Sequence, residues 1–81
     1  MEYYAYILKS IKDKRYYYGS TSNIEVRIKK HNAGGVPSTK YRRPLELKYI
    51  HKYPSKKEAQ DRERYFKTID GYNWLKQNKV I

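Results

Sequence analysis

The sequence has no cysteine, only two histidines and only eight acidic residues. Without thiols, neither a disulfide framework nor a thiolate metal site can form, and two histidines alone make a poor zinc site. Any bound metal would therefore be a hard ion on oxygen ligands. No apolar run approaches the roughly 20 residues that a membrane span needs, and the first residues are too polar for a secretory signal. We therefore expect a cytoplasmic protein.

The shortage of acidic residues leaves a large positive charge. Nineteen Lys and Arg against eight Asp and Glu give the 81-residue chain a net charge of +11. A charge this large on a small chain favours a polyanionic partner. The basic residues are spread along the whole chain, and no stretch has the wide apolar face of a membrane-surface helix. We expect the partner to be nucleic acid and not a membrane.

The length predicts one domain, covering residues 1–81, with a core close to the lower limit of what folds unaided. Residues 3–9 are apolar on both faces, which predicts a central strand that is covered on two sides. A polar turn at 10–14 leads into a returning strand at 15–21. In that second strand, Gly19 leaves room for the close approach of another backbone or a ligand.

A first helix is predicted by the pair Ser22 and Glu25, which fits an S-x-x-E capping box with Ser22 as the N-cap. The helix should run to about Asn32 and end at the following two glycines. Residues 36–44 contain two prolines and show no periodicity, so we expect an exposed basic loop. The next strand, at 45–53, has mixed faces that suit an edge. One expected face carries Leu45, Leu47, Tyr49 and His51, and the other carries Glu46, Lys48, Ile50 and Lys52.

Ser55 and Glu58 repeat the capping signal, and the helix that they begin should continue to about Ile69, with Gly71 just past its end. The expected apolar stripe of this helix consists of Ala59, Phe66 and Ile69. A short closing helix at 72–78 would pack Trp74 and Leu75. The order β-β-α-β-α-α predicts an α+β domain with a small three-stranded antiparallel sheet flanked by helices.

Three polar residues interrupt the apolar helix faces. Arg27 and His31 share a face with Ile24 and Ile28, and Glu63 lies on the inner face of the second long helix. One interpretation is structural, with Arg27 and Glu63 forming an ion pair or reaching to the edge of the core. His31 alone also suits a helix C-terminus, where the macrodipole favours it. The other interpretation is that these residues belong to a functional site.

The order and spacing of several short motifs resemble those of the GIY-YIG nucleases. Tyr4-Ala5-Tyr6 stands for the Gly-Ile-Tyr motif, and Tyr17-Tyr18-Gly19 stands for Tyr-Ile-Gly. The resemblance covers nearly the whole chain and is greatest to small stand-alone members, with similarity also to the nuclease domain of the excision-repair subunit UvrC. The match continues through Ser20-Thr21, Arg27, His31-Asn32, the loop from Ser38 to Pro44, Glu58-Ala59, Glu63 and Lys67.

This resemblance implies a GIY-YIG fold that hydrolyses phosphodiester bonds of DNA, in repair or recombination, with one divalent cation. Glu63 would hold Mg²⁺ or Mn²⁺, because Mg²⁺ keeps much of its hydration and needs few protein ligands. Arg27 would brace the phosphate, a task that suits a planar and permanently charged group. The base is either Tyr17 or His31. We expect a relay in which Tyr17 contacts the water, His31 accepts the proton and Tyr6 holds the geometry.

Four residues of the predicted loop, Lys40, Tyr41, Arg42 and Arg43, are expected to contact the nucleic-acid backbone. Tyr41 would either stack on an unpaired base or pack against the sheet. Arg42 and Arg43 would either contact the substrate or form a solvated face. The alternative function is a non-catalytic DNA- or RNA-binding module on the same fold. Because the sequence shows no separate targeting domain, a targeting protein is among the expected partners.

Overall fold

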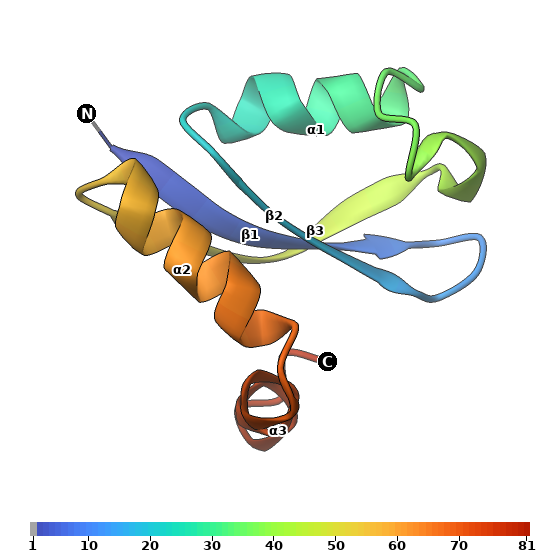
Figure 1. Cartoon of the computed structure of the whole chain (residues 1–81). Coiled ribbons are helices and arrows are strands. Elements are labelled where there is room, and N and C mark those ends of the chain that lie inside the picture. Colours follow the sequence, from blue (N-terminus) through green and yellow to red (C-terminus); the bar gives the residue numbers. More distant parts are fainter. Residues whose placement is uncertain (1) are drawn as a thin grey trace.

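The computed structural model describes residues 2–81, and its elements follow the predicted order β-β-α-β-α-α (Figure 1). The sheet is antiparallel with the strand order β2-β1-β3, so the first strand is central and the third lies at an edge, as expected. Within the described residues, no helix is long and apolar enough to cross a membrane. The elements are β1 (Tyr3–Ser10), β2 (Tyr16–Thr21), α1 (Ile24–Asn32), the short 3-10 helix η1 (Lys40–Arg42), β3 (Leu45–Tyr53), α2 (Lys56–Phe66) and α3 (Ile69–Gln77).

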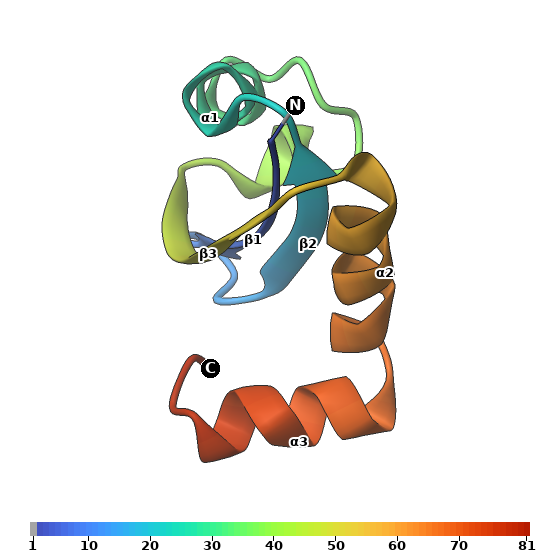
Figure 2. The ribbon, with the colours of Figure 1, turned by 90° about the vertical axis from the view of Figure 1, so that its left-hand side faces the viewer.

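The central strand β1 builds one core on each face of the sheet. Ala5 and Ile7 pack with Phe66 and Leu75, beneath α2 and α3. On the opposite face, Tyr6 and Leu8 pack with Leu45, beneath α1. Figures 1 and 2 show α1 on one side of the sheet and the other two helices on the other side. Burial of each large apolar side chain contributes about 1.5–3 kcal/mol, so both small cores are needed.

Helix α1 begins one residue later than its sequence predicts. Asn23 is the N-cap, and its side-chain oxygen accepts a hydrogen bond from the backbone N–H of Val26 (3.2 Å). Asn and Ser cap helices equally well, so Ser22 and Asn23 competed for the position. The hydroxyl of Thr21 decides between them, because it accepts a hydrogen bond from the backbone N–H of Asn23 (3.2 Å). The end of the helix at Asn32, followed by Gly34 with a φ of +84°, agrees with the prediction.

Helix α2 starts as predicted and ends earlier. Ser55 is its N-cap, and the Ser55 hydroxyl accepts a hydrogen bond from the backbone N–H of Glu58 (3.3 Å). The helix stops at Phe66, and Thr68 caps a new helix by accepting a hydrogen bond from the N–H of Gly71 (3.1 Å). The prediction that Ile69 continues the apolar stripe is wrong, since its side chain is 80% exposed at the start of α3.

Gly71 lies inside α3 and does not end the preceding helix. A side-chain Cβ at this position would overlap the backbone carbonyl of Tyr65. The glycine therefore permits the last turn of α2 and the first turn of α3 to pack closely. Its absent side chain serves a tertiary contact, whereas a glycine in sequence near a helix end is more often a stop signal.

Strand β3 does not keep one side-chain alternation from end to end. Its register with β1 shifts between Ile7 and Leu8, where β3 bulges. Leu45 consequently packs in the core beneath α1, whereas Tyr49 packs in the core beneath α2 and α3. The predicted common face for these residues is wrong, because a bulge changes the face of every later residue in a strand.

Candidate functional site

Tyr6 lies at the middle of β1, directly opposite Gly19 of β2. Its side chain is fully buried, and a Cβ on Gly19 would overlap the hydroxyl end of the Tyr6 ring. The close approach predicted at Gly19 is therefore confirmed, and the group that makes it is a tyrosine ring of the same sheet. This glycine lets the Tyr6 ring lie flat across β2 and reach toward α1.

The Tyr6 hydroxyl connects two residues of α1. Arg27 Nε donates a hydrogen bond to Tyr6 Oη (3.2 Å), and Tyr6 Oη is also hydrogen-bonded to His31 Nε2 (3.2 Å). The other ring nitrogen of His31, Nδ1, is hydrogen-bonded to Thr39 Oγ1 (2.8 Å). The ring of Tyr17 lies against His31 in an edge-on arrangement, with centroids 4.8 Å apart. The structure thus brings Tyr6, Tyr17, Arg27 and His31 together.

Burial and charge set the protonation of this cluster. Burial raises the pKa of Tyr6, and the negative charge of Glu63 raises it further. The hydrogen bond from Arg27 acts in the opposite direction and lowers this pKa. The pKa of Arg27 is raised, first by its hydrogen bond to Tyr6. Burial, assisted by the positive charges of Arg27 and Lys30, lowers the pKa of His31 to about 4. At neutral pH the cluster therefore holds a neutral phenol, a neutral imidazole and a guanidinium cation.

Glu63 projects from α2 toward β2. Its Oε1 accepts a hydrogen bond from the Ser20 hydroxyl (2.9 Å), and its Oε2 accepts one from Lys67 Nζ (3.0 Å). The predicted inward position of Glu63 is confirmed. In the structure of residues 2–81, Glu63 forms no ion pair with Arg27, which removes the structural pairing of these two residues as an explanation for both.

The two halves of the predicted site meet at β2. Tyr17 and Gly19 face α1, and Ser20 faces α2, because successive residues of a strand point to opposite sides of the sheet. Helix α2 lies alongside β2 in Figure 2. A hollow of about 310 Å³ is lined by Gln60, Glu63 and Arg64. Tyr6, Tyr17, Arg27 and His31 do not line this hollow. Glu63 acts on this cluster through its negative charge, which helps to raise the pKa of Tyr6.

The donor atoms around Glu63 fit a weakly held, oxygen-preferring cation. The carboxylate and the Ser20 hydroxyl offer hard oxygen ligands, the kind that Mg²⁺ and Mn²⁺ accept. Among the described residues, no group of three or more His, Cys, Asp or Glu side chains converges to hold a metal. A cation at Glu63 would therefore depend on water and substrate oxygens for most of its coordination.

The predicted relay from Tyr17 to His31 finds no hydrogen bond between these two residues among the described contacts. The two ring nitrogens of His31 are hydrogen-bonded to Tyr6 and Thr39, and Tyr17 contacts His31 only through an edge-on packing of the two rings. The lowered pKa also makes His31 a weak proton acceptor at neutral pH. A direct transfer from Tyr17 to His31 is therefore wrong for this arrangement.

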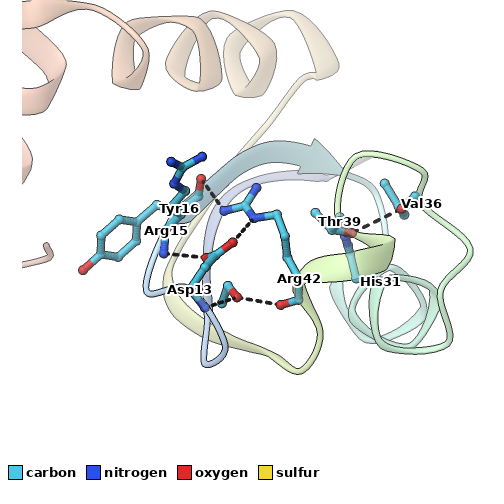
Figure 3. Close-up of polar contacts among 8 residues, drawn as sticks. Asp13, Arg15, Tyr16, His31, Val36, Thr39 and Arg42 are labelled. Carbon is cyan, nitrogen blue, oxygen red and sulfur yellow. Dashed lines mark hydrogen bonds and ion pairs between the residues drawn. The ribbon is translucent and has the colours of Figure 1, made fainter.

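Arg42 and Arg43 make internal contacts in the loop before β3. Arg42 Nε donates to Asp13 Oδ2 (3.1 Å) and Nη2 donates to the carbonyl of Tyr16 (3.4 Å), joining the loop to the β1–β2 turn (Figure 3). Arg43 Nε donates to the carbonyl of Lys40 (2.8 Å). Arg42 is partly buried by these contacts, whereas Arg43 stays exposed while it bonds the loop backbone. The loop is not fully exposed, because Thr39 within it is buried.

Lys40, Tyr41 and Arg43 are the exposed members of the predicted nucleic-acid set, and Lys40 and Tyr41 make no hydrogen bond to the sheet among the described contacts. Tyr41 is 76% exposed, so it does not pack against the sheet, and that alternative is wrong. The Lys40 ammonium lies 5.5 Å from the centre of the Tyr41 ring. Together they present an aromatic face and a positive charge on a loop that Arg42 braces.

Thr39 and Ser20 are two residues of the site that lie within the matched motifs but to which the sequence assigned no role. Thr39 lies in a loop without periodicity, and only its burial and its contact with His31 mark it. Ser20 follows Gly19 at a strand end, where a serine is common. A position directly after the Tyr-Tyr-Gly motif was the one available signal, and its partner Glu63 is distant in sequence.

The fold and the site define a small α+β domain in which a tyrosine, an arginine and a glutamate are arranged around one edge strand. The protein-family model described as the GIY-YIG catalytic domain matches residues 2–77, and the chain belongs to this family. It is 46% identical to UPF0213 protein SH2523 of Staphylococcus haemolyticus, over 93% of this chain and 92% of that one. It is 48% identical to UPF0213 protein CPE1444 of Clostridium perfringens, over 82% of this chain and 71% of that one.

The solution NMR structure of UPF0213 protein BH0048 from Bacillus halodurans has the same fold. The TM-score is 0.58 at 36% sequence identity, and the match covers 99% of this chain and 87% of that one. The predicted family and fold class are thus confirmed. The chain thus belongs to a nuclease family, and the family implies a nucleic acid as the substrate class.

Proposed function

We propose that this protein is a divalent-metal-dependent endonuclease that hydrolyses phosphodiester bonds of DNA. One observation carries the proposal. Arg27 is hydrogen-bonded to Tyr6, whereas Glu63 is hydrogen-bonded to Ser20 and Lys67. Among the described contacts, Arg27 and Glu63 do not bond to one another. The Arg27 cation and the Glu63 carboxylate are therefore oriented separately and do not neutralise one another, and the ion pair that Glu63 does form is with Lys67 on its own helix.

Arg27 binds and orients the phosphate in this proposal. Its bond to Tyr6 uses Nε alone, so the terminal nitrogens of the guanidinium are the part that can fork to two phosphate oxygens. The hydrogen bond to Tyr6 also fixes the plane of the guanidinium before substrate arrives. Such preorganised charge stabilises the negative charge that develops on the phosphate in the transition state.

Tyr17 is the residue of the cluster that we assign to position and activate the attacking water. Its ring is partly exposed, whereas Tyr6 and His31 are fully buried and hydrogen-bonded to one another. Its edge-on contact with His31 holds the Tyr17 ring beside the Tyr6 hydroxyl that Arg27 bonds. His31 supports Tyr17 from the side by ring contact and supports Tyr6 by a hydrogen bond.

Glu63 and Ser20 would hold the divalent cation, Mg²⁺ or Mn²⁺. When bound, the cation supplies charge that stabilises the leaving oxygen and the phosphate. Lys67 donates to Glu63 Oε2 and orients the carboxylate from the other side. Lys40 and Tyr41 would contact the nucleic acid beyond the scissile phosphate, with repair or recombination in the cytoplasm as the proposed setting.

The test is cleavage of branched, flapped and nicked DNA by the purified protein, with Mg²⁺ or Mn²⁺ and with EDTA. We expect cleavage with metal, no cleavage with EDTA, and a loss of at least about 100-fold in rate for Glu63→Gln, which removes the metal-binding charge. Glu46→Gln is the matched control, because this exposed carboxylate on β3 pairs with Lys48 and lies outside the proposed site. Tight DNA binding without metal-dependent cleavage of any substrate would favour the non-catalytic module instead.

A further inference from the structure

Thr39, Tyr6 and His31 form a fully buried chain of hydrogen bonds that starts at Arg27. Distances along it are 3.2 Å from Arg27 Nε to Tyr6 Oη, 3.2 Å from Tyr6 Oη to His31 Nε2 and 2.8 Å from His31 Nδ1 to Thr39 Oγ1. The Thr39 hydroxyl then lies 3.4 Å from the backbone carbonyl of Val36. Figure 3 shows Thr39 between His31 and Val36. The chain connects the predicted phosphate ligand to the loop before β3.

The two ends of this chain determine its direction. A guanidinium N–H only donates, and a backbone carbonyl only accepts. All four hydrogen bonds form only if Tyr6 donates to His31 Nε2, His31 Nδ1 donates to Thr39, and Thr39 donates to the Val36 carbonyl. His31 is then neutral, with its single ring proton on Nδ1.

The reverse direction leaves a buried proton without an acceptor. If Thr39 donated to His31 Nδ1, then His31 Nε2 would donate to Tyr6 Oη, which already accepts from Arg27. The phenolic hydrogen of Tyr6 would have no partner among the described residues, and Tyr6 is 0% exposed to water. Unsatisfied buried donors are rare because they lose hydration without replacement. The count of hydrogen bonds thus favours the first direction.

We propose that Thr39 is a positioning residue whose hydroxyl oxygen holds His31 in the Nδ1–H tautomer, which in turn directs the Tyr6 hydroxyl proton away from Arg27. With the proton directed to His31, the Tyr6 oxygen presents a lone pair to Arg27 Nε. The guanidinium is then held in one plane. Without Thr39, His31 can move its proton to Nε2, donate to Tyr6 and compete with Arg27 for the same oxygen.

The test is the tautomer of His31, read from the chemical shifts and ring couplings of its two nitrogens by NMR in the full chain. We expect a protonated Nδ1 and an unprotonated Nε2 in the wild type at neutral pH. Thr39→Val, which keeps the side-chain shape and removes the hydroxyl, should move the proton to Nε2. Thr39→Ser should restore the wild-type pattern. Ser38→Ala is the control, because Ser38 is the exposed neighbouring hydroxyl of the same loop.

A wild-type His31 that is protonated on Nε2, or on both nitrogens, overturns the proposal even if Thr39→Val does not fold. An unchanged tautomer in a folded Thr39→Val variant also overturns it. The rate measurement rests on the proposed function: kcat should fall by about tenfold in Thr39→Val with KM little changed, and recover in Thr39→Ser. If the protein cleaves no DNA, the proposed function fails, while the tautomer still decides the role of Thr39.

Discussion

His31 carries both of its ring nitrogens in hydrogen bonds and has no exposed surface. An imidazole in such a place is held neutral, because a second ring proton would have to displace the hydrogen bond from Tyr6 and would lie near the positive charges of Arg27 and Lys30. The residue therefore serves as an uncharged bridge between α1, β1 and the loop. Its protonation should oppose folding.

We predict that the free energy of unfolding falls as the pH falls through the range that protonates a free histidine. The folded pKa is about 4 against an ordinary value of 6.5, so the unfolded chain takes up a proton first. The stabilisation is complete above about pH 6.5 and is lost toward about pH 4, with a total of about 3 kcal/mol. Urea unfolding followed by circular dichroism at a series of pH values measures this loss.

The upper part of that pH range isolates His31, because most carboxyl groups titrate below about pH 5. His51→Gln is the control, since His51 is exposed on β3 and its loss should leave the slope unchanged. A free energy of unfolding that stays constant between about pH 6.5 and about pH 5 in both proteins would contradict the assigned environment of His31.

At the scale of residues, the sequence could indicate which side chains were out of place, but not their partners. Helical periodicity placed Arg27, His31 and Glu63 on inward faces, and the structure agrees. The contact of Thr39 with His31 depends on how a loop without periodicity folds back over α1. Loop conformations of this kind are set by tertiary contacts, which no local pattern encodes.

The loop between α1 and β3 is the element that combines structural and binding residues. Arg42 ties it to the β1–β2 turn through Asp13, and the Ser10 hydroxyl donates to the Arg42 carbonyl (2.6 Å). Lys40 and Tyr41 point outward from the same few residues. Charge in this loop therefore has two separable uses, one within the protein and one toward its ligand.

We predict that Arg42→Met and Lys40→Met have opposite consequences. Arg42→Met should lower the free energy of unfolding by about 1 kcal/mol, because it removes the side-chain donor to Asp13 Oδ2 and to the carbonyl of Tyr16. Lys40→Met should leave stability within about 0.5 kcal/mol of the wild type and should weaken DNA binding. Urea unfolding and fluorescence anisotropy with a labelled oligonucleotide measure the two effects.

Equal losses of stability in the two variants would contradict this division of the loop. So would a loss of DNA affinity in Arg42→Met under conditions where the variant remains fully folded and Lys40→Met binds normally. Lys48→Met is a useful reference, because this lysine lies on the edge strand β3 and pairs with Glu46.

Element order was predictable because each helix and strand has its own local signals, such as the serine cap of α2 and the two apolar faces of β1. The errors occur where a tertiary contact overrides such a signal. Gly71 suggested a helix end, yet its role is the close packing of α3 on the Tyr65 carbonyl. The bulge in β3 is likewise a property of its pairing with β1, which the sequence of β3 alone does not reveal.

The whole molecule carries its excess charge unevenly along the chain. From the start of α1 to the end of η1, Glu25 is the only acidic residue, against five basic ones: Arg27, Lys29, Lys30, Lys40 and Arg42. The α2 segment instead includes three of the eight acidic residues, Glu58, Asp61 and Glu63. The face formed by α1 and its following loop is thus the more positive one, and it is the face beside the Tyr6 cluster.

We predict that DNA binding weakens steeply with salt and that the α1 face accounts for the slope. Each phosphate neutralised by a lysine or arginine contributes a slope of about −0.9 in a plot of log affinity against log salt for duplex DNA. Lys29→Met or Lys40→Met should each reduce the slope by about one, while Lys57→Met on α2 should not. Binding isotherms at several salt concentrations measure the slope, and an affinity independent of salt would contradict an electrostatic interface.

The opposite face of the sheet has a different character, because it concentrates the aromatic core. The single tryptophan, Trp74, lies there with Phe66 and Tyr49, and the Arg62 guanidinium lies 4.6 Å from its ring centre. Its emission colour and quenching therefore report whether α3 is docked on the sheet, independently of the Tyr6 cluster beneath α1. Excitation energy passed from the eleven tyrosines would add a second optical signal for the whole fold. Trp74 thus lies on the other face of the sheet from the Tyr6 cluster, so its fluorescence reports the docking of α3 separately from changes in that cluster.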